Sequence, residues 1–282
     1  MRVLLVPNPV NERSVAAVRE SALWLDAHGQ EAILVTEDAA ACGMPNLSVS
    51  RSGLGEPALV VALGGDGTIL KAVHILGGID APILGINLGR LGFLSGAEDD
   101  DLFDALESAL AGEARVEHRA TLQAVIDAGG REVGTYHALN EILVSRGGRA
   151  RVVELEVRVN GTRLWDFRCD GVIVATPTGS TAYALSAGGP IVSPDVRAII
   201  LVPVAPHALV SRPIVLGPSD CVEIVCPNPV RADACITVDG EPVPCRGTLD
   251  AVRISTGEHD VRLLKPNGKR FAEVLSDKLL GG

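Results

Sequence analysis

The spacing of apolar residues changes once along this chain of 282 residues, near residue 115. Before that point, nearly continuous apolar runs such as 58–63 and 82–86 alternate with segments whose apolar residues recur every three or four positions. Buried parallel strands have the first pattern and amphipathic helices the second. Residues 1–115 therefore predict an α/β domain with a parallel sheet covered by helices on both faces.

Beyond residue 115 the spacing of apolar residues shortens to every second position. Residues 152–159 alternate between apolar and polar side chains, and Asn160-Gly161 follows them as a strong β-hairpin signal. Further apolar runs, at 164–167 and 172–175, are separated by turn residues. Residues 116–260 therefore predict a mostly antiparallel, β-rich domain. The sequence leaves open whether the tail, 261–282, returns to the first domain.

Composition argues against several classes of function. The net charge of -10 gives no basic field for polyanions, and 3% aromatic residues offer few stacking surfaces for single-stranded nucleic acid. No apolar run reaches the roughly 18 residues of a membrane span, and the first residues do not resemble a signal peptide. Six cysteines in a chain of this length do not indicate a disulfide framework, and none belongs to a CxxC pair that would indicate a zinc site. We expect a cytoplasmic protein that binds neither nucleic acid nor membrane.

A glycine-rich loop, GGDGT at 64–68, follows the apolar run 58–63 and opens a predicted helix. Glycines let the backbone approach a ligand closely, and the N–H groups at a helix start bind phosphate. A carboxylate in such a loop would repel a phosphate, so its presence indicates a specific role. Asp66 is therefore expected to hold a metal ion or to accept a proton from an attacking hydroxyl. A capping turn alone would not require three glycines. The loop matches neither a P-loop nor the GxGxxG fingerprint.

Three other segments carry polar groups next to predicted strands. Residues 87–94 follow the strand 82–86, and Arg90 among them could face a phosphate or simply be solvated. Residues 176–186 are rich in hydroxyls and glycine and suit a polar, phosphorylated ligand, although a capping turn explains some of those hydroxyls. Asn140-Glu141 could recognise a ribose diol or a base edge, or could be ordinary loop polars.

Together these motifs resemble those of the NAD kinases. The resemblance rests on GGDGT (64–68), NLGRLGFL (87–94), LNEILV (139–144) and DGVIVATPTGSTAYALSAGGP (170–190), in that order. It implies phosphorylation by ATP of the 2′-hydroxyl of the adenosine ribose of NAD, which gives NADP. It also implies a cytoplasmic homo-oligomer, a dimer or a tetramer. Glycine backbones, a carboxylate and Mg²⁺ are sufficient parts for such a phosphoryl transfer.

The resemblance also assigns roles to individual residues. Asp66 matches the proton acceptor at the reacting ribose, and Ala205 matches a contact that can come from a neighbouring subunit. The family varies at Lys71, Arg90 and Ser186. The expected binding residues for the substrate and the donor are Gly64, Gly65, Gly67, Thr68, Lys71, Arg90, Asn140, Glu141, Arg168, Asp170, Thr181, Ala182, Tyr183, Ser186 and Ala205. Cys169 is expected to be a strand residue without a nucleophilic role.

Two rival functions belong to other classes. Diacylglycerol and sphingosine kinases look similar through a GGDGT loop and a β-rich second domain, but they lack the segment TPTGSTAY found here at 176–183. A non-catalytic regulator that binds NAD would not need Asp66. The sequence does not choose between ATP and polyphosphate as the phosphate donor, or between NAD and NADH as the acceptor.

Overall fold

A computed structural model describes residues 1–89, 92–148, 152–208, 211–229, 233–245, 247–266 and 269–280. Backbone contacts divide the chain into two compact units, one made of residues 1–118 and 261–282 and the other of residues 119–260. The tail thus belongs to the first unit, a question that the sequence had left open. The change in sequence pattern near residue 115 falls close to this division.

A mostly parallel sheet forms the centre of the first unit, with the strand order β3-β2-β1-β4-β5-β20-β7 and with β6 paired to β5. The pairings of β1 with β2 and β4, of β2 with β3, and of β5 with β4, β6 and β20 are all parallel. The strands are β1 (Arg2–Pro7), β2 (Glu31–Val35), β3 (Ser48–Val49), β4 (Leu59–Leu63), β5 (Ile83–Asn87), β6 (Ala97–Glu98), β7 (Arg115–Arg119) and β20 (Val261–Lys265). The predicted α/β domain is confirmed.

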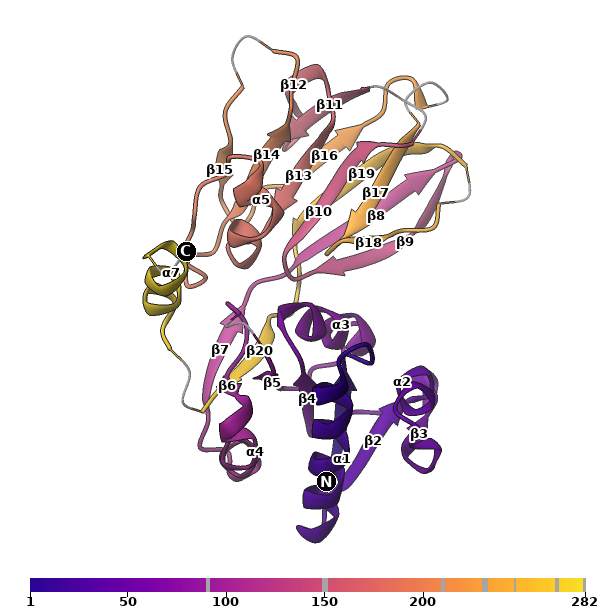
Figure 1. Cartoon of the computed structure of the whole chain (residues 1–282). Helices are drawn as coiled ribbons and strands as arrows, with labels where there is room; N and C mark the ends of the chain where they lie inside the picture. Colours follow the sequence, from indigo (N-terminus) through magenta and orange to yellow (C-terminus); the bar gives the residue numbers. More distant parts are fainter. Residues whose placement is uncertain are drawn as a thin grey trace. The chain divides into compact units, whose positions relative to one another are not determined.

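Helices cover both faces of this sheet, as the sequence predicts (Figure 1). Val3 and Leu5 point to one face, where they share a core with α1 and α4. On the other face Ile69 of α3 packs so closely on Gly85 that a Cβ at position 85 would overlap its Cδ1 atom. The helices are α1 (Glu12–Ala27), α2 (Thr36–Ala41), α3 (Asp66–Leu76), α4 (Leu102–Ala111) and α7 (Phe271–Leu280), with 3₁₀ turns η1 (Pro45–Leu47), η2 (Arg51–Gly53) and η3 (Asp99–Asp101).

The second unit is a sandwich of two antiparallel sheets, β15-β14-β13-β10-β17-β18 and β12-β11-β16-β19-β8-β9. Alternate residues of both sheets, among them Ile142 and Val222, meet in one aliphatic core. The strands are β8 (Leu122–Ala128), β9 (Arg131–Ala138), β10 (Glu141–Arg146), β11 (Val153–Val159), β12 (Thr162–Cys169), β13 (Gly171–Ala175), β14 (Ile199–Val204), β15 (Ile214–Leu216), β16 (Val222–Val225), β17 (Ala234–Val238), β18 (Glu241–Pro242) and β19 (Leu249–Thr256).

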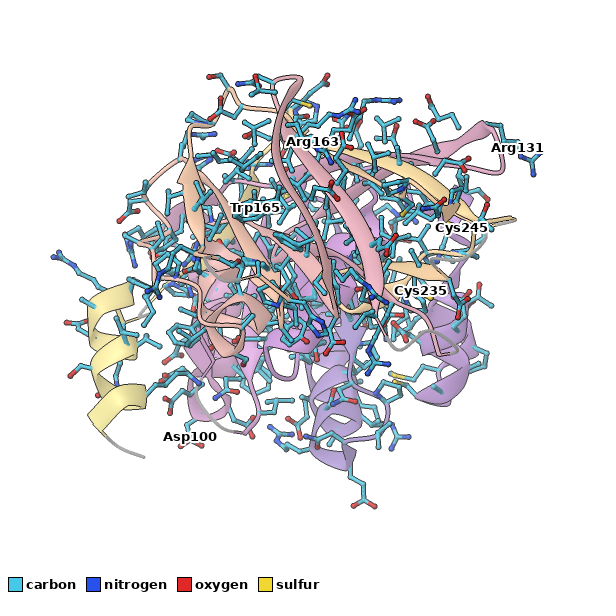
Figure 2. The ribbon with its side chains drawn as sticks, turned by 90° about the horizontal axis from the view of Figure 1, so that it is seen from above. Asp100, Arg131, Arg163, Trp165, Cys235 and Cys245 are labelled. Atoms are coloured by element: carbon cyan, nitrogen blue, oxygen red, sulfur yellow. The ribbon has the colours of Figure 1, made fainter. Side chains whose placement is uncertain are left out.

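The predicted hairpin at Asn160-Gly161 joins β11 to β12. Both residues have positive φ, 51° and 79°, which is the backbone of the turn that matches strand twist. Figure 2 shows Arg163 just past this turn and Trp165 farther along β12. The ring of Trp165 packs on that of Phe167, with 5.5 Å between their centroids. The hairpin prediction is therefore confirmed.

A short helical segment covers the outer face of the first sheet of the sandwich. The 3₁₀ turn η4 (Thr178–Thr181) and α5 (Tyr183–Ser186) follow β13, and Ala184 packs on Ile173 and Ile200. Each of these two helical segments, on either side of Ala182, is little more than one turn long. Nowhere in the described part of the chain is a helix both long and apolar enough to span a membrane.

Candidate active site

The glycine-rich loop lies where β4 ends and α3 begins, with Asp66 as the first residue of the helix. Gly64 has no room for a side chain, because a Cβ there would overlap Oγ1 of Thr68. A cavity of about 290 Å³ opens beside the loop. Its lining residues come from the ends of two neighbouring parallel strands and from the start of α3: Pro7, Asn8, Pro9, Gly65, Gly67, Thr68 and Lys71. Of the binding residues predicted for the first unit, Gly65, Gly67, Thr68 and Lys71 thus line one cavity, and Gly64 precedes Gly65 in the same loop.

Lys71 supplies a cation at the edge of this cavity. Its Nζ atom donates to the carbonyl of Pro7 at 3.0 Å and to Oδ1 of Asp38 at 2.5 Å. Asp38 is 3% exposed, and its other oxygen, Oδ2, has no hydrogen-bond partner. A buried carboxylate that the sequence did not single out therefore holds Lys71, whose side chain is 36% exposed, at the cavity. An ammonium beside the N–H groups of a helix start suits a phosphate ligand.

Two backbone N–H groups of the loop after β5 fix the side chain of Asp66. Phe93 donates to Oδ2 at 2.8 Å, and Leu94 donates to Oδ1 at 3.0 Å. Gly92 lies directly against this carboxylate, since a Cβ there would overlap Oδ1. The two motifs GGDGT and NLGRLGFL therefore meet at Asp66. Arg90, in the second motif, lies outside the described residues, and its role stays a prediction.

In the second unit, Asn140 ends the short loop after β9 and Glu141 begins β10, and the backbone here is held from two sides. The Asp239 carboxylate accepts N–H groups from Leu139 at 2.8 Å, Asn140 at 2.7 Å and Glu141 at 3.0 Å. On the other side, the N–H of Thr176 donates to the Asn140 carbonyl at 2.8 Å, and its hydroxyl donates to the Leu139 carbonyl at 2.6 Å. The Asn140-Glu141 pair is thus a rigid feature and not a loose polar loop.

Sequence reasoning missed Asp239, although a signal was present. Asp239 and Gly240 join β17 to β18 with positive φ at both positions, 48° and 84°. An Asp-Gly pair between two strands is typical of this turn. What the sequence could not indicate is that the carboxylate reaches a loop about a hundred residues away.

Glu141 is buried, with 8% of its surface exposed, and its Oε2 atom has no hydrogen-bond partner. Burial first, and then the nearby Asp239 carboxylate, raise the pKa of Glu141 from 4.5 to about 7, while the backbone N–H of Tyr183 lowers it. Near neutral pH this side chain can therefore accept or donate a hydrogen bond. Such a group, beside an amide and an exposed tyrosine, is suited to ligand hydroxyls.

Three hydroxyls of the loop 176–186 donate hydrogen bonds within the protein. Thr176 is bound to the Leu139 carbonyl, Ser180 to the carbonyls of Pro177 and Val192, and Thr181 to the carbonyl of Thr178 at 3.2 Å. These three hydroxyls hold the loop itself together. Tyr183 (44% exposed) and Ser186 are exposed, and Ala182 is half-buried, so these remain available to a ligand.

The other predicted residues of the second unit lie at the opposite end of β13. Asp170 precedes β13 and forms an ion pair with Arg146 at 3.0 Å. Arg168 is exposed and lies 3.5 Å from Glu154, while Ala205, with a φ of 44°, follows β14, the neighbour of β13. Since β13 has five residues, this group is about 16 Å along the strand from the loop 176–186. One copy of the second unit therefore does not bring all of its predicted residues together.

Cys169 lies between Arg168 and Asp170 but is fully buried. Burial raises the pKa of its thiol to about 12, and the backbone N–H of Gly171 lowers it only partly. The thiol is therefore protonated at neutral pH and unsuited to nucleophilic attack, as expected.

Comparisons with known proteins agree with this geometry. Residues 3–114 match the model of the ATP-NAD kinase N-terminal domain, and residues 139–265 match that of the ATP-NAD kinase C-terminal domain. The chain is 39% identical over 280 residues to the NAD kinase of Symbiobacterium thermophilum, covering 98% of both chains. It is 38% identical over 267 residues to the NAD kinase of Syntrophotalea carbinolica, covering 94% of this chain and 93% of that protein. The chain belongs to the ATP-NAD kinase family.

Two solved structures of NAD kinases share the fold. The yeast NADH kinase complexed with NADH superimposes with a TM-score of 0.89 at 28% identity, covering 100% of this chain and 87% of that one. The Archaeoglobus fulgidus NAD kinase in complex with ATP gives a TM-score of 0.76 at 28% identity, covering 98% of both chains. The fold and the family inferred from the sequence are therefore confirmed.

A pH-dependent stability should follow from Glu141 in this member of the ATP-NAD kinase family. Its pKa is higher in the folded state than in the unfolded state, so the folded state binds the proton more tightly and loses stability as the pH rises from 4.5 through 7. Relative to Glu141→Gln, the wild type should lose about 2–3 kcal/mol between pH 5 and pH 8. Urea unfolding of both proteins at the two pH values measures this difference, and parallel pH profiles would contradict the assignment.

Proposed function

We propose that this chain transfers the terminal phosphate of ATP to the 2′-hydroxyl of the adenosine ribose of NAD and so produces NADP. Membership of the ATP-NAD kinase family supports the reaction. One observation carries it further: a carboxylate, Asp66, is fixed by two backbone N–H groups beside a cavity that offers helix N–H groups and the ammonium of Lys71. A phosphoryl transfer to an alcohol requires a proton acceptor and cationic stabilisation of phosphate, and these groups supply both.

In the proposed reaction the ribose 2′-oxygen attacks the terminal phosphorus of ATP, the bond to the bridging oxygen breaks, and ADP leaves. The hydroxyl proton moves to the Asp66 carboxylate. Both oxygens of Asp66 already accept an N–H, but each keeps a further lone pair, so the carboxylate can take this proton while it stays fixed. The N–H groups at the start of α3 and Lys71 would stabilise the charge on the transferred phosphate.

We further propose that Mg²⁺ enters as part of the donor, Mg-ATP. The described residues contain no cluster of three His, Cys, Asp or Glu side chains that would form a protein-bound metal centre. The only carboxylate in the glycine-rich loop, Asp66, is already held by Phe93 and Leu94. This donor set fits an ion that is bound mainly by phosphate oxygens and water, as Mg²⁺ commonly is in such sites.

One experiment distinguishes the proposed NAD kinase reaction from the two rival functions, a lipid kinase and a non-catalytic regulator. The purified protein would be incubated with Mg-ATP and NAD, and NADP would be assayed with an NADP-specific dehydrogenase. Parallel reactions would offer labelled ATP to diacylglycerol and sphingosine, replace NAD by NADH, and replace ATP by polyphosphate. Label in a lipid and none in the dinucleotide would identify a lipid kinase, and NAD binding without turnover would identify a regulator.

The enzyme is also proposed to be a cytoplasmic homo-oligomer. All six cysteines are free thiols, which fits a reducing compartment. The positions of the binding residues support assembly, because the group Arg168, Asp170 and Ala205 lies at one end of β13 and the Asn140-Glu141 loop lies at the other. In an oligomer, each site would combine one group from one copy with the other group from its neighbour.

Complementation between two impaired variants should reveal such shared sites. Asn140→Ala and Asp170→Ala should each lower kcat/KM for NAD by about 10- to 100-fold, because a partner hydrogen bond is lost. When the two are co-expressed and pair at random, half of the dimers are mixed and hold one intact site, so about one quarter of the wild-type activity should return. If each site is built from a single copy, the co-expressed pair keeps only the low activity of the separate variants.

Asp66→Asn tests the proton acceptor. The amide of the variant cannot take the proton, so turnover should fall at least ~100-fold. Its NH₂ group would also face the N–H of Phe93 or Leu94, where the carboxylate accepts a hydrogen bond. The dissociation constant of NAD should change by less than ~10-fold, because the glycine backbone remains. Stopped assays with labelled ATP and equilibrium binding of NAD measure the two quantities. Partial recovery at high Mg²⁺ or with Mn²⁺ would indicate a metal role, and a near-normal kcat would reduce Asp66 to a structural contact that holds the loop of Phe93 and Leu94.

A further inference from the structure

The loop after β5, which binds Asp66, is itself held by strand β20. The ammonium of Lys265, which is 4% exposed, donates to the carbonyl of Leu94 at 2.8 Å and also to the carbonyl of Ser95. The backbone of β20 packs against the same loop, because a Cβ on Gly96 would overlap the carbonyl oxygen of Leu264. The N–H groups of residues 93 and 94 therefore bind Asp66, while the carbonyls of residues 94 and 95 bind Lys265.

Helix α7 holds the same loop through a side chain. The ring of Phe271, the first residue of α7, packs on the ring of Phe93 with 6.1 Å between centroids. Lys278 lies seven residues later, on the same face of the helix, and its Nζ atom is 4.9 Å from the centre of the Phe93 ring. The ring of Phe93 is thus held by an aromatic pair and a cation–π contact.

Helix α7 also has local contacts that do not involve Phe93. Val274 is 6% exposed, and the N–H of Arg270 donates to Oε2 of Glu273 at 2.7 Å at the start of the helix. Lys269 and Asp277 form an exposed ion pair at 2.7 Å along the helix. Removal of the Phe271 ring therefore leaves this hydrogen bond and this ion pair of the helix in place.

We propose that Lys265, Phe271 and Lys278 are positioning residues for the reaction: Phe271 and Lys278, through Phe93, and Lys265, through Leu94, hold the Asp66 carboxylate in its reactive place. This inference rests on the proposed function of Asp66. Phe271 touches no reacting atom in this proposal; it acts through the loop. A small displacement of a catalytic group can cost up to 10²-fold in rate, so the contact matters even though it is distant from the substrate.

A double-mutant cycle with Asp66→Asn distinguishes positioning from general stability. Phe271→Ala in the wild-type background should lower kcat by about 10- to 100-fold, with the KM values for NAD and ATP within ~3-fold, because only the position of Asp66 changes. In the Asp66→Asn background the same substitution should lower kcat by less than ~2-fold, since there is no carboxylate left to position. Phe271→Tyr keeps the ring and should retain kcat within ~3-fold.

Asp277→Asn is the matched control, because it removes an exposed ion pair on the same helix and should leave kcat within ~2-fold of wild type. Equal losses of kcat from Phe271→Ala in both backgrounds would overturn the proposal, because they would indicate general instability. A second readout does not depend on activity: hydrogen exchange of the segment 92–96 should speed up in Phe271→Ala and not in Asp277→Asn. Unchanged exchange would overturn the positioning role, whereas a wild-type protein that makes no NADP would overturn the proposed function instead.

Discussion

The carboxylate of Asp66 accepts hydrogen bonds from two successive backbone N–H groups, those of Phe93 and Leu94. This contact joins the loops at the ends of two neighbouring parallel strands, β4 and β5. A charged acceptor makes a stronger hydrogen bond than a neutral one, and the loss of a partner would leave partly buried N–H groups unsatisfied. The same contact fixes the orientation of the proposed proton acceptor, so loop structure and chemistry depend on one interaction.

The second unit uses a comparable arrangement. Asp239 binds three successive N–H groups at the Asn140-Glu141 loop, and Thr176 binds the carbonyls on its other side. Because Asp239 also lies near the Glu141 carboxylate, it contributes to the raised pKa of Glu141. The residue that orders this loop thus also tunes the protonation of a side chain proposed to contact NAD. In the first unit the N–H groups of a separate loop hold the Asp66 carboxylate, and in the second unit the Asp239 carboxylate holds the backbone at Asn140-Glu141. Each unit therefore positions its candidate residues by hydrogen bonds between a carboxylate and N–H groups that are distant in the sequence.

The positions of the predicted binding residues at the two ends of β13 are relevant to the proposed homo-oligomer. Asp170 precedes this strand and the hydroxyl-rich loop follows it, so the antiparallel sheet holds the two groups of predicted binding residues apart. The hydroxyls of Thr176, Ser180 and Thr181 are engaged within the protein, which leaves Tyr183 and Ser186 as the exposed polar groups of that loop. A shared site in an oligomer would reconcile this separation with recognition of one dinucleotide.

The amino-acid sequence alone specifies the fold class, the hairpin at Asn160-Gly161 and the loop of Asp66, because apolar periodicity and turn residues act over short distances along the chain. It also determined the family, since the four motifs are contiguous. Asp239, Lys265 and Phe271 are recognised as supports of the site in the folded structure alone. Their partners lie about a hundred residues or more away, and no local pattern indicates which distant backbone group a carboxylate, an ammonium or an aromatic ring will contact once the strands pair.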